Sequence, residues 1–121
     1  MGNFKELKVW TRSKELAIRI YRLTNQSLFA KDFGLRDQIR RAAVSVPSNI
    51  AEGDELKTQK QGLNHLYIAK GSLAELRTQL EIALGIEYIT EEIFTTIDSE
   101  CDEIGKMIAS LINHRNKNLD S

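Results

Sequence analysis

The sequence is poor in the residues on which most non-helical folds depend. It has one proline, Pro47, and seven glycines, whereas turn-rich sheet proteins use both residues freely. Its single cysteine, Cys101, cannot form a disulfide within the chain. No run of about 18 apolar residues is present, so we expect no membrane-spanning segment and no membrane partner. No signal-like segment stands at the N-terminus, which favours a cytoplasmic location.

The composition is that of one folded domain. The chain has 121 residues, of which 41% are hydrophobic and 28% charged, as in ordinary globular proteins. We expect a single domain over residues 1–116. Residues 117–121 carry too little apolar content to pack, so we expect a disordered C-terminal tail there.

Charge is unevenly distributed along the chain although the formal net charge is zero. Residues 1–60 hold 12 Lys and Arg against 7 Asp and Glu, while residues 61–121 hold 5 against 10. If the basic helices share a surface, that surface attracts phosphate. If they alternate with the acidic helices, the charges pair within the molecule instead.

Four segments show apolar residues at steps of three and four, which is typical of amphipathic helices. They cover residues 7–24, 35–50, 58–85 and 90–115, and Thr58 and Thr90 are suited to cap the last two. Short joins at 53–57 and 85–88 make neighbouring helices antiparallel. The pattern predicts an all-α protein, an antiparallel up-down-up-down four-helix bundle.

Pro47 lies inside the second apolar pattern. It lacks the N–H that would bond to Ala43, and its ring crowds that carbonyl group. Because Ile50 continues the apolar stripe beyond it, we predict that the second helix is kinked at Pro47 and not broken.

The third segment is apolar on more than one side. Ile68 and Ile82 fall outside its inward stripe, and an apolar face too wide for one bundle favours a second interface, most simply self-association. The alternative is that these are isolated exposed aliphatic residues, which are common on protein surfaces.

Arginines gather on the outward faces of the first two helices. On one interpretation these cations are an ordinary solvated surface, with Glu15 and Arg19 paired along one helix. On the other they bind nucleic-acid phosphates. The candidate residues are Arg12, Arg19, Arg22, Arg36, Arg40 and Arg41.

A polar cluster is predicted beside Pro47. Polar groups that face a core must find hydrogen-bond partners, and the cluster is either a structural network or subunit contact, or the wall of a ligand pocket. Lys70, on the shoulder of the third helix, is the candidate partner of Glu52. The residues concerned are Ser45, Ser48, Asn49, Glu52 and Lys70.

No arrangement of catalytic or metal-binding residues can be recognised. Neither His65 nor His114 belongs to the Glu-x-x-His pairs of di-iron bundles, and Cys101 occupies a core position of the fourth helix. No phosphate-binding loop or nucleophile elbow is present. We therefore predict no enzymatic activity, no metal and no cofactor.

Three ordered blocks carry a family resemblance: residues 40–53 (RRAAVSVPSNIAEG), 4–10 (FKELKVW) and 66–76 (LYIAKGSLAEL). They resemble the hallmark segments of the bacterial 23S rRNA-intervening sequence proteins, a four-helix-bundle family. The resemblance implies a homo-oligomer, with the pentameric barrels of that family. A related protein is the accessory protein of diversity-generating retroelements, which binds nucleic acid and a reverse transcriptase.

Two functional hypotheses follow. In the first, the chain is a non-enzymatic, ring-forming accessory protein that binds RNA or DNA through its basic first and second helices. In the second, it is an oligomeric protein-interaction scaffold without nucleic-acid binding, its arginines paired with the acidic fourth helix at Asp98, Asp102 and Glu103. A third, enzymatic hypothesis requires that Ser48, Asn49, Glu52 and Lys70 line an open pocket.

Overall fold

The protein is described by a computed structural model over residues 3–55 and 58–120, with side chains described up to residue 117. Within these ranges the chain is helical and contains no strand. A short 3₁₀ helix, η1, and a one-turn helix, α2, accompany four long helices. The elements are η1 (Phe4–Glu6), α1 (Lys8–Leu23), α2 (Ser27–Lys31), α3 (Phe33–Glu55), α4 (Gln59–Gly85) and α5 (Glu91–Asp120).

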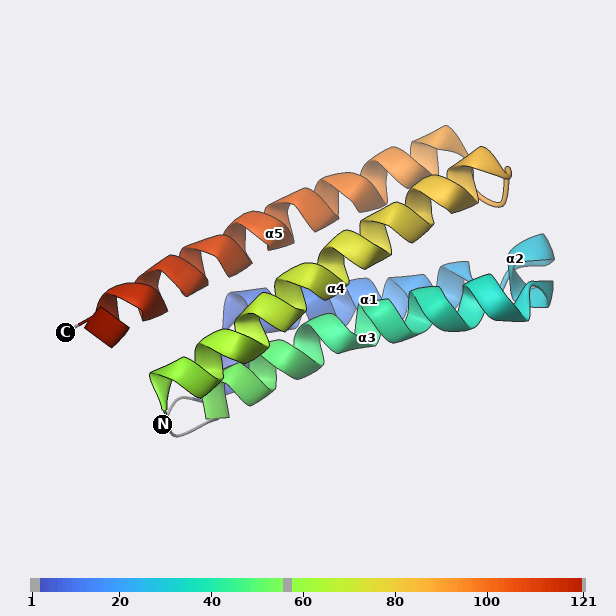
Figure 1. Cartoon of the computed structure of the whole chain (residues 1–121). Coiled ribbons are helices and arrows are strands. Elements are labelled where there is room, and N and C mark those ends of the chain that lie inside the picture. The colour runs from blue at the N-terminus through green and yellow to red at the C-terminus, as the bar shows by residue number, and fades with distance from the viewer. Residues whose placement is uncertain (1–2, 56–57, 121) are drawn as a thin grey trace.

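The four long helices form a bundle. Helix α1 packs beside α3 and α5, and α4 packs beside the same two helices. Figure 1 shows that successive long helices run in opposite directions, from the blue α1 to the red end of α5. The prediction of an all-helical four-helix bundle is confirmed.

The core is built from the stripes of residues that the periodicity marked. Ile20, Ile39, Leu66 and Ile104 have no exposed surface, and each such side chain contributes about 1.5–3 kcal/mol through burial. Cys101 is equally buried, and this burial raises the pKa of its thiol to about 12. The thiol is therefore a core side chain and not a reactive thiolate.

Side-chain caps define where the helices begin. The hydroxyl of Thr58 accepts a hydrogen bond from the amide of Gln61, and that of Thr90 accepts one from Ile93, both at 3.2 Å. Asp32 caps α3 in the same way, accepting from the Leu35 amide at 3.1 Å. Such caps satisfy amide groups that have no partner inside the helix.

Helix α3 continues through Pro47 to Glu55, so the proline does not break it; the kink stays a prediction. The side chain of Pro47 is buried. The join expected at 53–57 is shorter, because α3 includes residues 53–55, and residues 56 and 57 lie outside the described part. None of the helices described is long and apolar enough to cross a membrane.

The C-terminal region differs from the expectation of a disordered tail over 117–121. Helix α5 extends to Asp120, and Ser121 lies outside the described residues. Arg115 binds Asp54 at 2.9 Å and the Gly53 carbonyl at 3.3 Å, which ties the last turns of α5 to the end of α3.

Two further contacts fix the ends of the bundle. At the end near Gly53, α3 and α4 approach so closely that a Cβ placed on Gly62 would lie 2.7 Å from the Gly53 carbonyl oxygen. At the other end, the Tyr88 hydroxyl donates to the Asp32 carboxylate at 2.9 Å, joining the α4–α5 connection to the start of α3.

Candidate functional site

Arg12 is held by carboxylates of α5. Its Nε donates to Glu100 Oε1 at 2.9 Å, its Nη2 lies 2.8 Å from Glu100 Oε2, and Nη2 also binds Glu103. Hydrogen bonding within this group raises the pKa of Arg12 and lowers that of Glu100. Arg12, a candidate phosphate contact, is thus an internal link between α1 and α5.

Arg36 and Arg40 lie near the end of the bundle where α1 meets α3. The Arg40 guanidinium stacks on the Tyr21 ring at 4.5 Å and donates to the Thr24 hydroxyl at 2.8 Å. Arg36 stacks on Phe33 at 4.7 Å and donates to a carbonyl of α2 at 3.1 Å. Both side chains are oriented by contacts within the chain, and neither is fully buried.

Arg19, Arg22 and Arg41 are exposed on the outer surfaces of α1 and α3. No hydrogen bond or ion pair holds these three side chains in the part of the chain that the structure describes. They are the candidate arginines most accessible to an anionic partner.

The acidic face of α5 is largely neutralised from within the bundle. Arg77 of α4 binds Asp98 through two hydrogen bonds, at 2.9 and 3.1 Å, and Lys106 lies 3.2 Å from Asp102. Arg77 was not among the predicted residues. A signal for it was present, because Arg77 lies one turn after the core residue Leu73 on the helix that precedes the acidic α5. The charges of α5 are therefore paired mainly with Arg12, Arg77 and Lys106.

The polar cluster beside Pro47 is a chain of hydrogen bonds across the α3–α4 contact. Ser45 and Ser72 meet through their hydroxyls at 2.8 Å, and the Asn49 amide donates to the Ser45 carbonyl at 2.9 Å and to its hydroxyl at 3.0 Å. Nδ1 of His65 lies 2.9 Å from Asn49 Oδ1 and 3.0 Å from Glu52 Oε2. The sequence placed Ser45, Asn49 and Glu52 together but missed His65 and Ser72.

These contacts determine where the proton of His65 lies. The nitrogen of the Asn49 amide faces the Ser45 carbonyl, so its oxygen faces His65 and acts as an acceptor. Glu52 Oε2 is an acceptor as well. Because Nδ1 meets two acceptors, it acts as the hydrogen-bond donor in both contacts.

Ser48 and Lys70 lie apart from this cluster. Ser48 is exposed on α3. The expected Lys70–Glu52 pair is wrong: Lys70 is on the opposite side of α4 and lines a hollow with Asp102 and Lys106 of α5, while Glu52 contacts His65. The four residues required for an enzymatic pocket do not come together.

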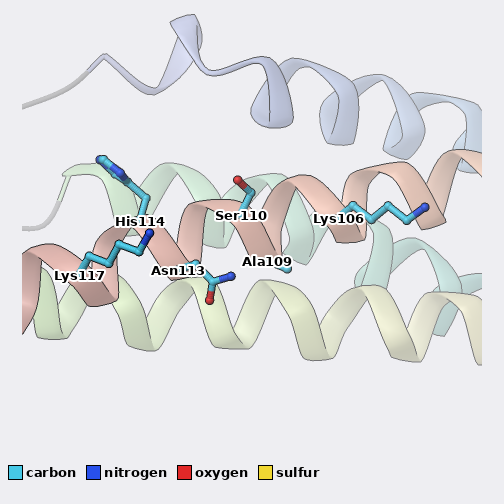
Figure 2. Close-up of a pocket in the computed structure, with 6 residues that line it drawn as sticks. All are labelled: Lys106, Ala109, Ser110, Asn113, His114 and Lys117. Atoms are coloured by element: carbon cyan, nitrogen blue, oxygen red, sulfur yellow. The ribbon is translucent and has the colours of Figure 1, made fainter.

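A shallow hollow of about 550 Å³ runs along the outer face of α5. Figure 2 shows that all six residues lining it come from this helix, so it is an open surface and not an enclosed site. Among the described residues, no group of three or more His, Cys, Asp or Glu side chains is placed to hold a metal ion. The residues are Lys106, Ala109, Ser110, Asn113, His114 and Lys117.

Fold and site together define a small helical-bundle protein whose polar groups mainly join helices and whose free arginines lie on α1 and α3. The chain belongs to the 23S rRNA-intervening sequence protein family, whose model matches residues 5–110. The resemblance seen in the sequence is confirmed.

A solved structure supports this membership. The chain is similar to a protein of unknown function from the S23 ribosomal protein family of Bacteroides thetaiotaomicron VPI-5482, with 31% identity and a TM-score of 0.81. The match covers 87% of this chain and 95% of the other. No curated protein matches the sequence significantly.

Proposed function

We propose that copies of this chain assemble into a ring and that the assembly acts as an accessory protein that binds RNA or DNA through arginines of α1 and α3. The observation that carries the proposal is the division among the arginines. Arg12 and Arg77 are occupied by carboxylates of α5, whereas Arg19, Arg22 and Arg41 are exposed without a partner in the described residues.

Internal pairing also reduces the repulsion that the acidic side chains of α5 would otherwise exert on a polyanion. Four acidic residues of α5 each contact a cation of the same molecule, so their field at the surface is weakened. Exposed guanidinium groups bind phosphate oxygens through paired N–H donors. Repetition of these groups around a ring multiplies weak contacts into a stable complex.

Salt-dependent binding tests the nucleic-acid part of the proposal. Affinity for a single-stranded RNA and for a DNA duplex is measured by fluorescence anisotropy between about 50 and 200 mM salt, a range in which phosphate contacts weaken strongly. In the Arg19→Glu, Arg41→Glu double variant, we expect weaker binding and a salt slope smaller by between one and two.

The matched control is Lys70→Glu, an equal charge change per site on the side of α4 that faces α5. It should bind nearly as the wild type does. Absence of salt-sensitive binding tighter than about 10 µM at the lowest salt, which is within the range of non-specific binding, would contradict the proposal.

The alternative function, a protein-interaction scaffold without nucleic-acid binding, is favoured by one observation. Arg12, Arg36 and Arg40 are already engaged inside the molecule, which removes half of the six candidate arginines from free solution. A scaffold would assemble, as judged by light scattering, yet show no affinity for either nucleic acid at low salt.

A further inference from the structure

A groove with apolar walls runs between α1 and α3. Ala17, Ile18 and Tyr21 form one side, Val44 and Pro47 the other, and the groove has a volume of about 450 Å³. Ile18, Tyr21 and Val44 are each between 41% and 45% exposed, although side chains of this kind gain from burial. The charged residues that line this α1–α3 groove are both cations, Lys14 and Arg22.

A second exposed apolar surface follows the outer side of α4. Ile68 and Ile82 lie on one helical face with Gly71 and Thr78, and Ile86, the residue that caps the end of α4, continues this face; the three isoleucines are between 47% and 50% exposed. The charged residue on this α4 stripe is an anion, Glu75. The two cations of the same stretch, Lys70 and Arg77, turn toward α5 instead.

We propose that the α1–α3 groove of one copy binds the α4 stripe of the next copy, so that the subunits join head to tail. Ile82 and Ile86, one turn apart, insert between Ile18 and Val44, and Glu75 faces the cations of the groove. The groove spans about 12 Å of α1, from Lys14 to Arg22, which suits two such side chains about 6 Å apart. This inference rests on the self-assembly in the proposed function and names its contact.

Charge decides against symmetric pairing of either surface with itself. Two grooves placed together would bring the cations Lys14 and Arg22 of one copy against the same cations of the other, and two stripes would leave Glu75 with no cation of the opposite stripe to face. Like charges brought together at an interface cost affinity, whereas groove against stripe pairs opposite signs. A head-to-tail contact also leaves one groove and one stripe free in every dimer, so growth continues until the ring closes.

The contact divides the exposed arginines between two tasks. Arg22 lines the groove and is covered by the neighbouring copy, while Arg19 faces the α5 side of α1 and Arg41 lies on the outer face of α3. Neither Arg19 nor Arg41 lines the groove, so in the proposed assembly these are the arginines left to meet phosphate.

Complementation between two variants tests the contact. Ile18→Asp places a charge in the groove and Ile82→Asp places one on the stripe, both at exposed positions. By light scattering we expect the wild type to be an oligomer and each variant alone to be a monomer. An equimolar mixture should form dimers and nothing larger, because only one intact groove can meet one intact stripe.

Controls keep the result decisive. Leu28→Asp, at an exposed position on α2, should assemble like the wild type. Circular dichroism checks that each variant is folded. If an aspartate variant unfolds, the double variant Lys14→Glu, Arg22→Glu replaces it, and adding Glu75→Arg should restore assembly.

An oligomeric wild type whose assembly survives Ile82→Asp, or a mixture that stays monomeric, overturns the head-to-tail contact alone. A monomeric wild type overturns it together with the proposed ring.

Discussion

At the scale of single residues, Asn49 is the centre of the contact between α3 and α4. Its amide donates to Ser45 while its oxygen accepts from His65, so one side chain joins both ends of the polar chain. The amide of Asn49 therefore has partners within the protein for both its nitrogen and its oxygen, and we expect the site to act as a structural joint.

We expect Asn49→Ala to lower the free energy of unfolding by about 1–3 kcal/mol, because His65 and Ser45 lose their partner in a half-buried place. Urea denaturation measures this change. Ser48→Ala, one residue earlier and exposed, is the control and should stay within about 0.5 kcal/mol of the wild type. Equal effects of the two substitutions would contradict a specific role for Asn49.

The sequence predicted part of this joint and missed the rest for a definite reason. Polar residues next to Pro47 in an apolar stripe indicated that Ser45, Asn49 and Glu52 need partners. Which residues of α4 supply them depends on how far the two antiparallel helices slide past each other. That register follows from the close approach of Gly53 and Gly62, which no periodicity reveals. The choice of Lys70 over His65 was a different error, because the helical period already places these two residues on different faces of α4.

At the scale of the helices, two glycines of α4 have opposite roles. A Cβ on Gly62 would lie 2.7 Å from the Gly53 carbonyl oxygen, whereas one on Gly71 would have nothing within 4 Å. Gly62 allows α3 and α4 to touch backbone to backbone. Gly71 lies on the exposed α4 stripe, where it has no such role within the subunit.

Gly62→Ala should therefore force the helices apart and cost about 1–3 kcal/mol of stability. Gly71→Ala should stabilise the protein by about 0.5–1 kcal/mol, because alanine loses less backbone entropy in a helix. Thermal or urea unfolding of the two variants provides the comparison. A neutral Gly62→Ala would show that the close crossing is not required.

The extents of the helices were predicted well where side chains mark their ends. Thr58 and Thr90 cap α4 and α5 as the sequence indicated. The end of α5 was placed too early; the helix continues beyond Arg115, whose side chain pairs with Asp54, 61 residues away in the chain. Contacts between distant residues leave no periodic signal.

At the scale of the whole molecule, self-assembly has a thermodynamic signature. If folded copies bind one another and unfolded chains do not, dilution destabilises the protein, since a partner acts as a ligand of the native state. The midpoint of thermal unfolding should then rise with protein concentration, by about 4 °C for each kcal/mol gained in a domain of this size.

Scanning calorimetry at increasing concentrations measures this shift. The Ile82→Asp variant should unfold at a midpoint that is independent of concentration. A wild-type midpoint that is also independent of concentration would contradict assembly, whichever surfaces are involved.

The sequence established the class of fold and the family but not which charges are free. The uneven charge along the chain left two possibilities: the basic helices share a surface, or their charges pair with those of the acidic helices. The structure contains both arrangements. Arg12 is paired and Arg41 is not, although the two looked alike in the sequence. The difference arises because Arg12 lies beside α5 and Arg41 points away from it.

The ties at the two ends of the bundle have a mechanical consequence. Arg115 and Asp54 fasten α5 to α3 at one end, and Tyr88 and Asp32 join the connections at the other. Helices held at both ends cannot slide along one another as rods without breaking these bonds. If copies assemble into the proposed ring, we therefore expect each bundle to enter it as one rigid body, so that any change in the width of the ring comes from tilting of whole subunits.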